Sequence, residues 1–364
     1  MRIWLAPSAF APHRGGVEEL TLKIAQHLLA AGEDVLVVTN QHPGSLPASE
    51  IVEGVPVRRI PFTAPGRRPR RVLHHLARLR PTRSALDALG PVPDLVHVVC
   101  PSTQLPPLHG WCRRHGVPLV ITSQGETEMD AGHLYQRSAW MRRHLRTSAA
   151  SAAALTSCSA WTAEAAGQLA PRFRDSTVIP NGVDPADWIG VPERTDEPVA
   201  AAWGRHVPQK GFDLLLAAWP LVRESIPDAR LLLGGDGPET PKLRGRAGAG
   251  VTLVGSLDRT GVRGLLGSAR VAVIPSRIEP FGIVAVEALA AGRGLVYSAG
   301  TGLAEAAGDC GRPADVHDPV VLAGAIIAEL QNPTPARCGI DHAEELSWVR
   351  LSLEYRAVYA GVLG

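Results

Sequence analysis

The chain has 364 residues, of which 45% are hydrophobic and 20% are charged. This composition excludes a disordered or collagen-like protein, and the length favours two domains. No apolar stretch is long enough to cross a bilayer, and Pro7 interrupts the first apolar run too early for a signal peptide.

Five cysteines are scattered along the chain: Cys100, Cys112, Cys158, Cys310 and Cys338. Their odd number and the lack of a C-x-x-C pair argue against a disulfide framework or a zinc site, so we expect a soluble cytoplasmic protein.

Charge is divided unevenly along the chain, although the net charge is only +2. Residues 1–180 carry 20 basic and 13 acidic side chains, whereas residues 181–364 carry 17 and 22. This polarity suggests different partners for the two halves, but no nucleic-acid module is recognisable. Among the basic residues 34 are Arg and three are Lys: Lys23, Lys210 and Lys242. Because an ammonium and a guanidinium are not interchangeable, each lysine is of particular interest.

Short apolar runs alternate with helix-length amphipathic segments in chain order. In the first half the runs predict strands over 2–6, 34–39, 95–99, 119–122, 155–158 and 177–179. In the second half they predict strands over 199–203, 230–234, 251–254, 271–275 and 294–298. Continuous β-branched runs are typical of strands buried on both faces of a parallel sheet. The alternation with helices therefore predicts an α/β fold.

Pro, Asp and Gly cluster over 181–198, which we interpret as the boundary between domains 1–180 and 181–346. Each half opens with a strand, a glycine-bearing loop and a helix. We expect two doubly wound, Rossmann-like domains that face each other across a cleft. Ligands of such folds bind at the carboxyl ends of the strands, so the loops there hold the candidate site residues.

Gly15 and Gly16 precede the first predicted helix. Glycines let a backbone approach a phosphate, and a helix N-terminus favours an anion, so Gly16 is a candidate phosphate contact. An ordinary turn between a strand and a helix fits the two glycines equally well. The segment is not the G-x-G-x-x-G fingerprint of nicotinamide dehydrogenases.

Arg205 and Lys210 follow the first strand of the second half. A bidentate guanidinium and a compact ammonium suit a diphosphate. The alternative, two solvated surface cations, is disfavoured by the position at the carboxyl end of a strand and by the scarcity of lysine.

The sharpest motif runs from Glu279 to Glu287, after the strand over 271–275. Pro280 and Gly282 suit a helix start, which would leave the N–H groups of 281–284 available to an anion. The two carboxylates suit sugar hydroxyls better than phosphate. A solvated helix face is the alternative, but Glu287 lies in an apolar run where an unpaired carboxylate is costly to bury.

Together these segments resemble the retaining glycosyltransferases of family 4, which have the GT-B fold. The resemblance covers nearly the whole chain and is carried, in order, by 15–18, 93–98, 178–184, 204–211, 235–239, 279–287 and 347–348. It implies that Arg205 and Lys210 neutralise the diphosphate of a nucleotide-sugar, and that Gly16 contributes to the same site. The resemblance also implies that the helix start within 279–287 contacts the donor through its backbone. The candidate residues there are Pro280, Phe281, Gly282, Ile283 and Val284.

The resemblance further implies roles for residues around the diphosphate. Glu279 would hold the donor sugar and Glu287 the ribose, while backbone near Gly255 and Ser256 would meet the base. Arg205, Lys210 and Glu279 are the catalytic candidates. The segment 347–364 would form a helix that packs back on the N-terminal domain, with Ser347 as its cap.

The sequence departs from the family on the acceptor side. Gln124 stands where members often carry His, and Gln cannot take up a proton. We retain His97, Gln124 and Glu126 as candidates on the acceptor and sugar side. His97 could equally be a satisfied histidine in a strand, and Glu126 could instead cap the helix that follows.

We therefore predict a retaining glycosyltransferase that uses a UDP- or GDP-sugar and a small-molecule or envelope-precursor acceptor. No D-x-D motif is present, so we expect neither a metal ion nor another cofactor. The alternatives are a sugar-nucleotide epimerase or phosphorylase, and a catalytically silent homologue that acts as a partner subunit.

The segment 66–80 contains six arginines and no acidic residue. Val72, Leu76 and Leu79 fall on one helical stripe, which would leave the arginines facing outward. A solvated helix is one interpretation. An anionic acceptor is another, and it is favoured slightly over peripheral contact with an anionic membrane.

Overall fold

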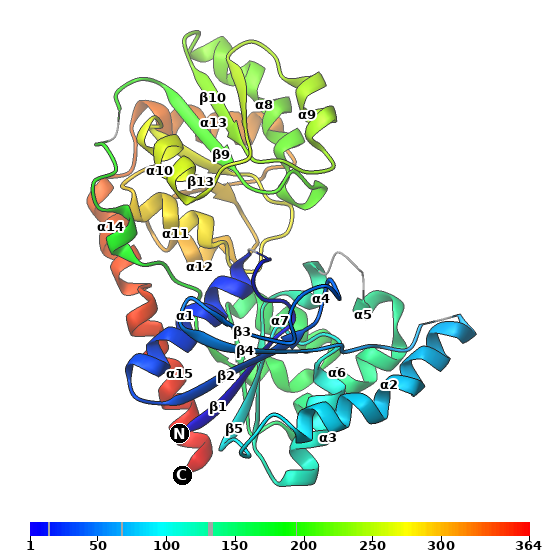
Figure 1. Ribbon diagram of the computed structural model, residues 1–364. Coiled ribbons are helices and arrows are strands. Elements are labelled where there is room, and N and C mark those ends of the chain that lie inside the picture. The colour runs from blue at the N-terminus through cyan, green and yellow to red at the C-terminus, as the bar shows by residue number, and fades with distance from the viewer. Residues whose placement is uncertain (14, 67, 130–133, 194) are drawn as a thin grey trace. The chain divides into compact units, whose positions relative to one another are not determined.

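The computed structural model describes residues 1–13, 15–66, 68–129, 134–193 and 195–364. Over these residues the chain forms two compact units (Figure 1). Unit 1 comprises Met1–Pro180 and Trp348–Gly364, and unit 2 comprises Asn181–Ser347. Each unit has its own sheet and its own hydrophobic core.

The described part of unit 1 forms an eight-stranded sheet in the order β3-β4-β2-β1-β5-β6-β7-β8. Its strands are β1 (Arg2–Pro7), β2 (Asp34–Asn40), β3 (Ser49–Val52), β4 (Val55–Ile60), β5 (Leu95–Val99), β6 (Leu119–Ser123), β7 (Ala154–Ser157) and β8 (Thr177–Val178). Neighbouring strands are parallel except in the antiparallel β3–β4 pair. The central strands β5 and β6 are buried throughout, as expected for a sheet covered on both faces.

The helices of unit 1 are α1 (Gly16–Ala30), α2 (Pro69–Asp87), α3 (Leu105–His115), α4 (Glu126–Met129), α5 (Leu134–Arg137), α6 (Ala139–Ser151), α7 (Ala160–Leu169) and α15 (Trp348–Leu363), with a 3₁₀ turn at Pro171–Asp175. Helices α6 and α7 have side-chain N-caps. The Ser138 hydroxyl accepts from the Met141 N–H, and the Ser159 hydroxyl accepts from the Thr162 N–H. Helix α15 packs beside α1 (Figure 1). Its Tyr355 and Tyr359 are fully buried, which ties this distant segment into the core of unit 1.

The described residues of unit 2 form a six-stranded parallel sheet in the order β11-β10-β9-β12-β13-β14. Its strands are β9 (Val199–Trp203), β10 (Arg230–Gly234), β11 (Val251–Gly255), β12 (Val271–Ile274), β13 (Gly294–Ser298) and β14 (Arg312–Ala314). The chain starts at β9, adds strands on one side, and then returns to add β12 on the other. The direction of strand addition therefore reverses between β9 and β12, and ligands of open α/β sheets bind at such a switch point.

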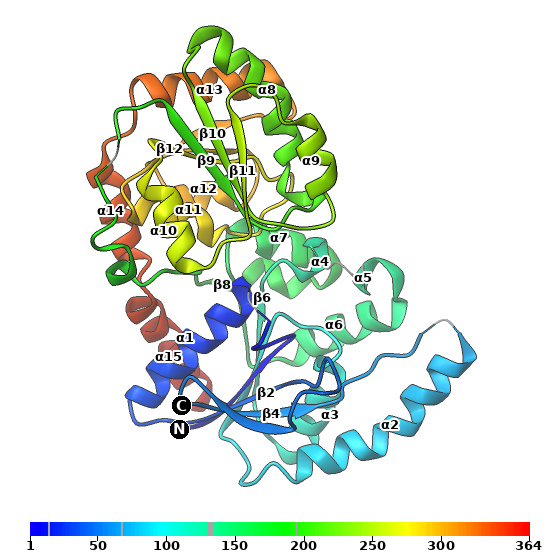
Figure 2. The same cartoon turned by 45° about the horizontal axis from the view of Figure 1, so that its top comes forward.

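The helices of unit 2 are α8 (Phe212–Ser225), α9 (Thr240–Arg246), α10 (Arg259–Gly267), α11 (Ile283–Ala290), α12 (Leu303–Ala307), α13 (Pro319–Gln331) and α14 (Ala336–Glu345), with 3₁₀ turns at Pro185–Trp188 and Pro208–Lys210. Helices α8 and α13 pack together on one face of the sheet, and α11 and α14 on the other (Figure 2). No helix that the structure describes, in either unit, is long and apolar enough to span a bilayer.

Three strands were not predicted. Strands β3 and β4 form a hairpin through Glu53 and Gly54, whose φ angles of 47° and 84° are left-handed. Such φ angles at both loop residues are typical of a tight hairpin turn, and Gly54 was the available signal. Strand β14 has only three residues and is too short for a periodicity argument.

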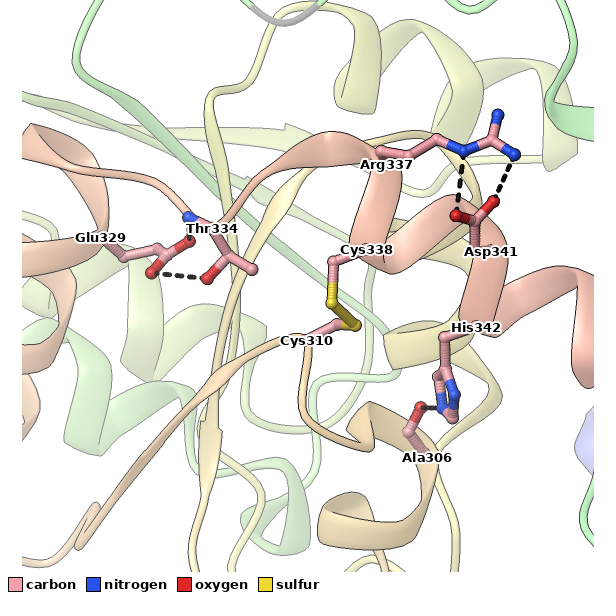
Figure 3. Close-up of a disulfide and its surroundings, with 8 residues drawn as sticks. All are labelled: Ala306, Cys310, Glu329, Thr334, Arg337, Cys338, Asp341 and His342. Carbon is pink, nitrogen blue, oxygen red and sulfur yellow. Dashed lines mark hydrogen bonds and ion pairs between the residues drawn. A yellow bond between two sulfur atoms is a disulfide. The ribbon is translucent and has the colours of Figure 1, made fainter.

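The expectation that the chain lacks a structural disulfide is wrong. Cys310 and Cys338 form a disulfide with Cα atoms 5.6 Å apart, 28 residues apart in the chain (Figure 3). Cys338 lies on α14 and Cys310 follows α12, and α11 packs against both helices. Helix packing brings the two thiols together, which spacing along the chain cannot reveal.

The predicted inward face of α2 is also wrong. Leu76 and Leu79 are 54% and 48% exposed, whereas His75, Thr82 and Leu86 are buried. The helix is thus turned from the expected orientation, because a buried face that includes His and Thr does not register in an apolar stripe.

Candidate functional site

Arg205, Lys210 and Glu279 lie on two loops at the switch point of the unit 2 sheet. One loop follows β9 and runs through Gly204 to Lys210, and the other follows β12 and runs from Pro275 to Gly282. Strands β9 and β12 are neighbours and parallel, so their carboxyl ends lie side by side. The structure therefore brings Lys210 and Glu279 together although 69 residues separate them.

Lys210 and Glu279 form an ion pair. The Lys210 ammonium donates to Glu279 Oε2 at 2.6 Å, and the Ser276 hydroxyl donates to the same oxygen at 3.2 Å. The Lys210 side chain is 20% exposed and that of Glu279 is 8% exposed. Arg205, by contrast, is exposed. An anion that reaches this point meets one exposed cation and one that is already paired.

Arg277 joins the two loops and was not predicted from the sequence. Its backbone N–H donates to Gln209 O at 2.8 Å, and its guanidinium donates to Pro208 O at 2.7 Å. The same guanidinium binds both carboxylate oxygens of Asp213, at 2.7 and 2.9 Å, and so lowers the pKa of Asp213. Arg277 therefore fixes the loop that carries Lys210 relative to the loop that carries Glu279.

Two glycines allow backbone segments to pack closely around these loops. Gly211 has φ 65°, and a Cβ there would lie 2.0 Å from the Pro275 carbonyl oxygen. A Cβ on Gly302 would lie 1.9 Å from the Pro280 carbonyl oxygen, while the Gly302 N–H donates to Glu279 O at 2.9 Å. The backbone of Glu279 and Pro280 is thus held by the segment that opens α12.

Gly282, with φ 95°, caps α11, which begins at Ile283. The first N–H groups of a helix lack acceptors within it, so this end can receive an anion. Phe281, just before the cap, is buried, and Val284, in the first turn, is half-buried. Glu287 is half-buried one turn further on, in an otherwise apolar helix.

The segment 235–239 packs against Gly204 and His206, the two chain neighbours of Arg205. A Cβ on Gly235 would lie 1.9 Å from the Gly204 carbonyl oxygen, which only glycine permits. The His206 N–H donates to Asp236 O at 2.9 Å, and the Glu239 N–H donates to His206 O at 3.0 Å. These bonds fix the backbone on one side of Arg205.

Gly255 and Ser256 are exposed at the carboxyl end of β11. The Gly235 N–H donates to Gly255 O at 2.6 Å, so this strand end lies beside the 235–239 segment. The loops that carry the candidate donor residues of unit 2 therefore follow the carboxyl edge of one sheet, in which the strand order is β11, β10, β9, β12.

In unit 1, Gly16 is the first residue of α1, after an extended Gly15. A Cβ on Gly15 would lie 2.7 Å from Glu18 Oε2, so the Glu18 carboxylate folds back over the helix N-terminus. Burial raises the pKa of Glu18. A phosphate at Gly16 would share this end of the helix with that carboxyl group.

His97 lies in the core, at the middle of β5. Its Nδ1 is 2.7 Å from the Tyr359 hydroxyl and its Nε2 is 2.5 Å from the Thr122 hydroxyl, and the ring is fully buried. Burial lowers the pKa of His97 to about 3, so the ring is neutral. Both nitrogens are engaged within unit 1, and we therefore leave His97 out of the site proposed below.

Gln124 and Glu126 are both buried at the carboxyl end of β6. The Glu126 carboxylate accepts from the Gln124 N–H at 2.7 Å and from the Ser123 hydroxyl at 3.0 Å. Burial raises the pKa of Glu126 to about 7, although these donors oppose the shift. Glu126 thus closes the turn into α4 and also titrates near neutral pH.

Two family models match this chain. The model for glycosyltransferase family 4 matches residues 14–187, and the model described as glycosyl transferases group 1 matches residues 197–332. The chain is 22% identical to the sucrose-phosphate synthase of Thermosynechococcus elongatus, with a TM-score of 0.76 over 100% of this chain and 99% of that one. It is 18% identical to Anabaena HepE in complex with UDP and glucose, with a TM-score of 0.73 over 99% and 100%. The fold is that of the GT-B glycosyltransferases.

Two mannosyltransferases are among the relatives of this chain. The chain is 30% identical, over 78% of its length and 74% of the relative, to the GDP-mannose:cellobiosyl-diphosphopolyprenol alpha-mannosyltransferase of Xanthomonas oryzae pv. oryzae. It is 29% identical, over 96% and 93%, to the GDP-mannose-dependent alpha-(1-6)-phosphatidylinositol dimannoside mannosyltransferase of Mycobacterium tuberculosis. A glycogen synthase of M. tuberculosis is 36% identical over 46% of this chain, which spans only 42% of that enzyme. The chain belongs to glycosyltransferase family 4.

Proposed function

We propose that the chain transfers a sugar from a UDP- or GDP-sugar to a small-molecule or envelope-precursor acceptor. The observation that carries this proposal is the Lys210–Glu279 ion pair at the switch point of unit 2. Arg205 lies on the same loop as Lys210, and Glu279 lies just before the N-terminus of α11. Two cations and the N–H groups at a helix start suit a diphosphate, and a carboxylate suits sugar hydroxyls. GDP-mannose appears in the names of two relatives, so it is the first donor to test.

In the proposed reaction the bond between the anomeric carbon and the diphosphate oxygen breaks through an oxocarbenium-like state. The acceptor oxygen forms its bond on the same face, which retains the configuration, and its proton passes to a leaving phosphate oxygen. Arg205, Lys210 and the N–H groups of 281–284 stabilise the charge on the leaving group. This charge stabilisation is our reason for proposing that the reaction needs no metal ion.

Glu287 would hold the ribose, and Gly255 and Ser256 would lie near the base, as their places in unit 2 suggest. Gly16 would contribute a phosphate contact, which we propose from the family resemblance and from its place at the start of α1. Unit 1 would bind the acceptor, with Gln124 and Glu126 as its candidate contacts. An anionic acceptor is supported by the arginines of α2 and by the phosphate-bearing acceptors in the names of the two mannosyltransferases.

A thermal-shift panel of GDP- and UDP-sugars, followed by turnover with the donor that binds, tests this function. A donor at 100 times its dissociation constant should add about 2.7 kcal/mol of stability. The product should keep the anomeric configuration of the donor by NMR, and the rate should not change with EDTA. Binding without transfer to any acceptor, or conversion of the donor when no acceptor is present, would contradict the proposal.

A further inference from the structure

A cavity of about 410 Å³ lies in unit 1 among α2, α3 and α6. Its walls come entirely from unit 1 and include none of His97, Gln124, Glu126 or Gly16. Helix α2 contributes one face of its surface, from His75 to Leu86, and α3 contributes Gly110 and its helical neighbours. Gly110 leaves space here, because a Cβ at this position would meet no atom within 4 Å.

The inner wall of the cavity is apolar. Leu86 and Trp111 are buried at its base, and Trp140, Pro106 and Pro107 complete it. Trp111 packs against Trp4 with ring centroids 4.7 Å apart, so its position is fixed by the core. Burial lowers the pKa of both His75 and His144, which favours the neutral form of the two rings.

The rim of the cavity is cationic. Arg78 and Arg83 of α2 are exposed there, and Arg114 of α3 joins them. The lining residues that the structure describes include no carboxylate. Asp87, outside the lining, accepts from the Trp111 indole N–H at 2.8 Å and forms an ion pair with Arg114 at 3.8 Å.

This combination selects one chemical class of ligand. A small inorganic anion would leave the apolar wall in water, and a neutral hydrocarbon would offer no negative charge to Arg78 and Arg83. Leu79 lines the cavity, and Leu73 and Leu76 continue the apolar surface outside it at 66% and 54% exposure. We infer that the cavity binds a single-chain amphiphilic anion, with the chain against Trp111 and Trp140 and an anionic head group at Arg78, Arg83 and Arg114.

Binding at this cavity can be measured without any nucleotide-sugar, so its failure is distinguishable from failure of the proposed glycosyl transfer. The probes are n-decyl phosphate below its critical micelle concentration, n-decanol and inorganic phosphate, each titrated by calorimetry. We expect decyl phosphate to bind at least about tenfold more tightly than either half of it, because charge-assisted hydrogen bonds and apolar burial both contribute. Equal affinity for inorganic phosphate would overturn the inference, as would binding to anionic vesicles alone.

The variant Gly110→Phe locates the site. A phenyl group at this position would fill the cavity from α3 without a backbone clash, and should weaken decyl phosphate binding at least tenfold, a loss that corresponds to about 1.4 kcal/mol. Gly361→Phe is the matched control, since Gly361 is an exposed helical glycine of unit 1 with nothing within 4 Å of a Cβ. Unchanged binding in folded Gly110→Phe would contradict the site.

The variant Arg83→Gln tests the head group, with Arg80→Gln as a control on the same helix that lies outside the cavity. We expect about a tenfold loss for decyl phosphate in Arg83→Gln and no change for Arg80→Gln. Equal losses in both variants would show non-specific attraction to α2 and would overturn the inference.

Discussion

Lys210 has a counter-ion in Glu279 before any donor arrives, and this pair sets the first prediction. Lys210→Ala should lower kcat by about 10² to 10³, because the leaving diphosphate would lose an electrostatic stabiliser. The matched control is Lys242→Ala, since Lys242 is an exposed lysine of α9 that pairs with Glu239 at 3.0 Å. Steady-state rates of both variants measure the effect on turnover, and their unfolding midpoints show whether each variant is folded. Near-native turnover of folded Lys210→Ala would remove it from the proposed diphosphate site.

Glu126 is the residue whose titration should be visible in stability. Its pKa is raised to about 7 by burial, so between pH 4.5 and 7 the folded chain holds a proton that the unfolded chain releases. The contribution of Glu126 to stability is therefore full below pH 4.5 and is lost as pH rises through 7. Glu126→Gln should match the wild type at pH 4.5 and exceed it at pH 8 by up to about 3 kcal/mol.

Urea unfolding of wild type and Glu126→Gln at the two pH values measures this difference. Glutamine can keep both hydrogen bonds, since the Ser123 hydroxyl can turn to accept. Glu128→Gln, at an exposed site two residues away, is the control and should show no such pH dependence. A wild type and a Glu126→Gln variant with parallel pH profiles would show that Glu126 is charged throughout.

At the scale of the elements, the disulfide between Cys310 and Cys338 holds α14 to the segment that follows α12. A cross-link that closes a loop of 28 residues stabilises a fold by about 3.5 kcal/mol in the chain-entropy account. Reduction with a thiol should therefore lower the unfolding midpoint of unit 2. The double variant Cys310→Ser and Cys338→Ser should show the lower midpoint without reductant. A wild type that responds to reductant no more than this variant would mean that the two thiols are not joined.

The sequence predicts the elements well where one residue class dominates them. Parallel strands such as β5 and β9 are continuous apolar runs, and glycines mark the loops after β9 and β12. Features that depend on two distant segments escape this reasoning. The Arg277–Asp213 contact, the orientation of α2 and the Cys310–Cys338 disulfide each need the packed structure, because their local sequences contain no periodic signal.

At the scale of the whole molecule, unit 2 is a continuous segment whose ends meet. The Val183 N–H donates to Leu346 O at 3.0 Å, and Val183 pairs with Ser347 in a β-bridge. We expect a fragment over 181–347 to fold alone, with one cooperative transition in urea followed by circular dichroism. A fragment that lacks this transition would show that unit 2 depends on unit 1.

Unit 1 should behave differently, because α15 completes it. A fragment over 1–180 lacks Leu351, Tyr355 and Tyr359, which are buried in the whole chain. It should bind a hydrophobic dye and aggregate, whereas joining 348–364 to it through a short Gly/Ser linker should restore cooperative unfolding. Identical behaviour of the fragments with and without 348–364 would contradict a structural role for α15.

The place of α15 in unit 1 also has a consequence for biosynthesis. The ribosome makes 1–180 before unit 2, whereas the helix whose Tyr359 contacts His97 is made only after unit 2. At about 5–20 residues per second, the remaining chain takes roughly 10–40 s to synthesise. Unit 2 can therefore complete its fold first. Unit 1, although synthesised earlier, still lacks the α15 side chains that complete its core. During this interval we expect unit 1 to expose apolar surface that a chaperone can bind.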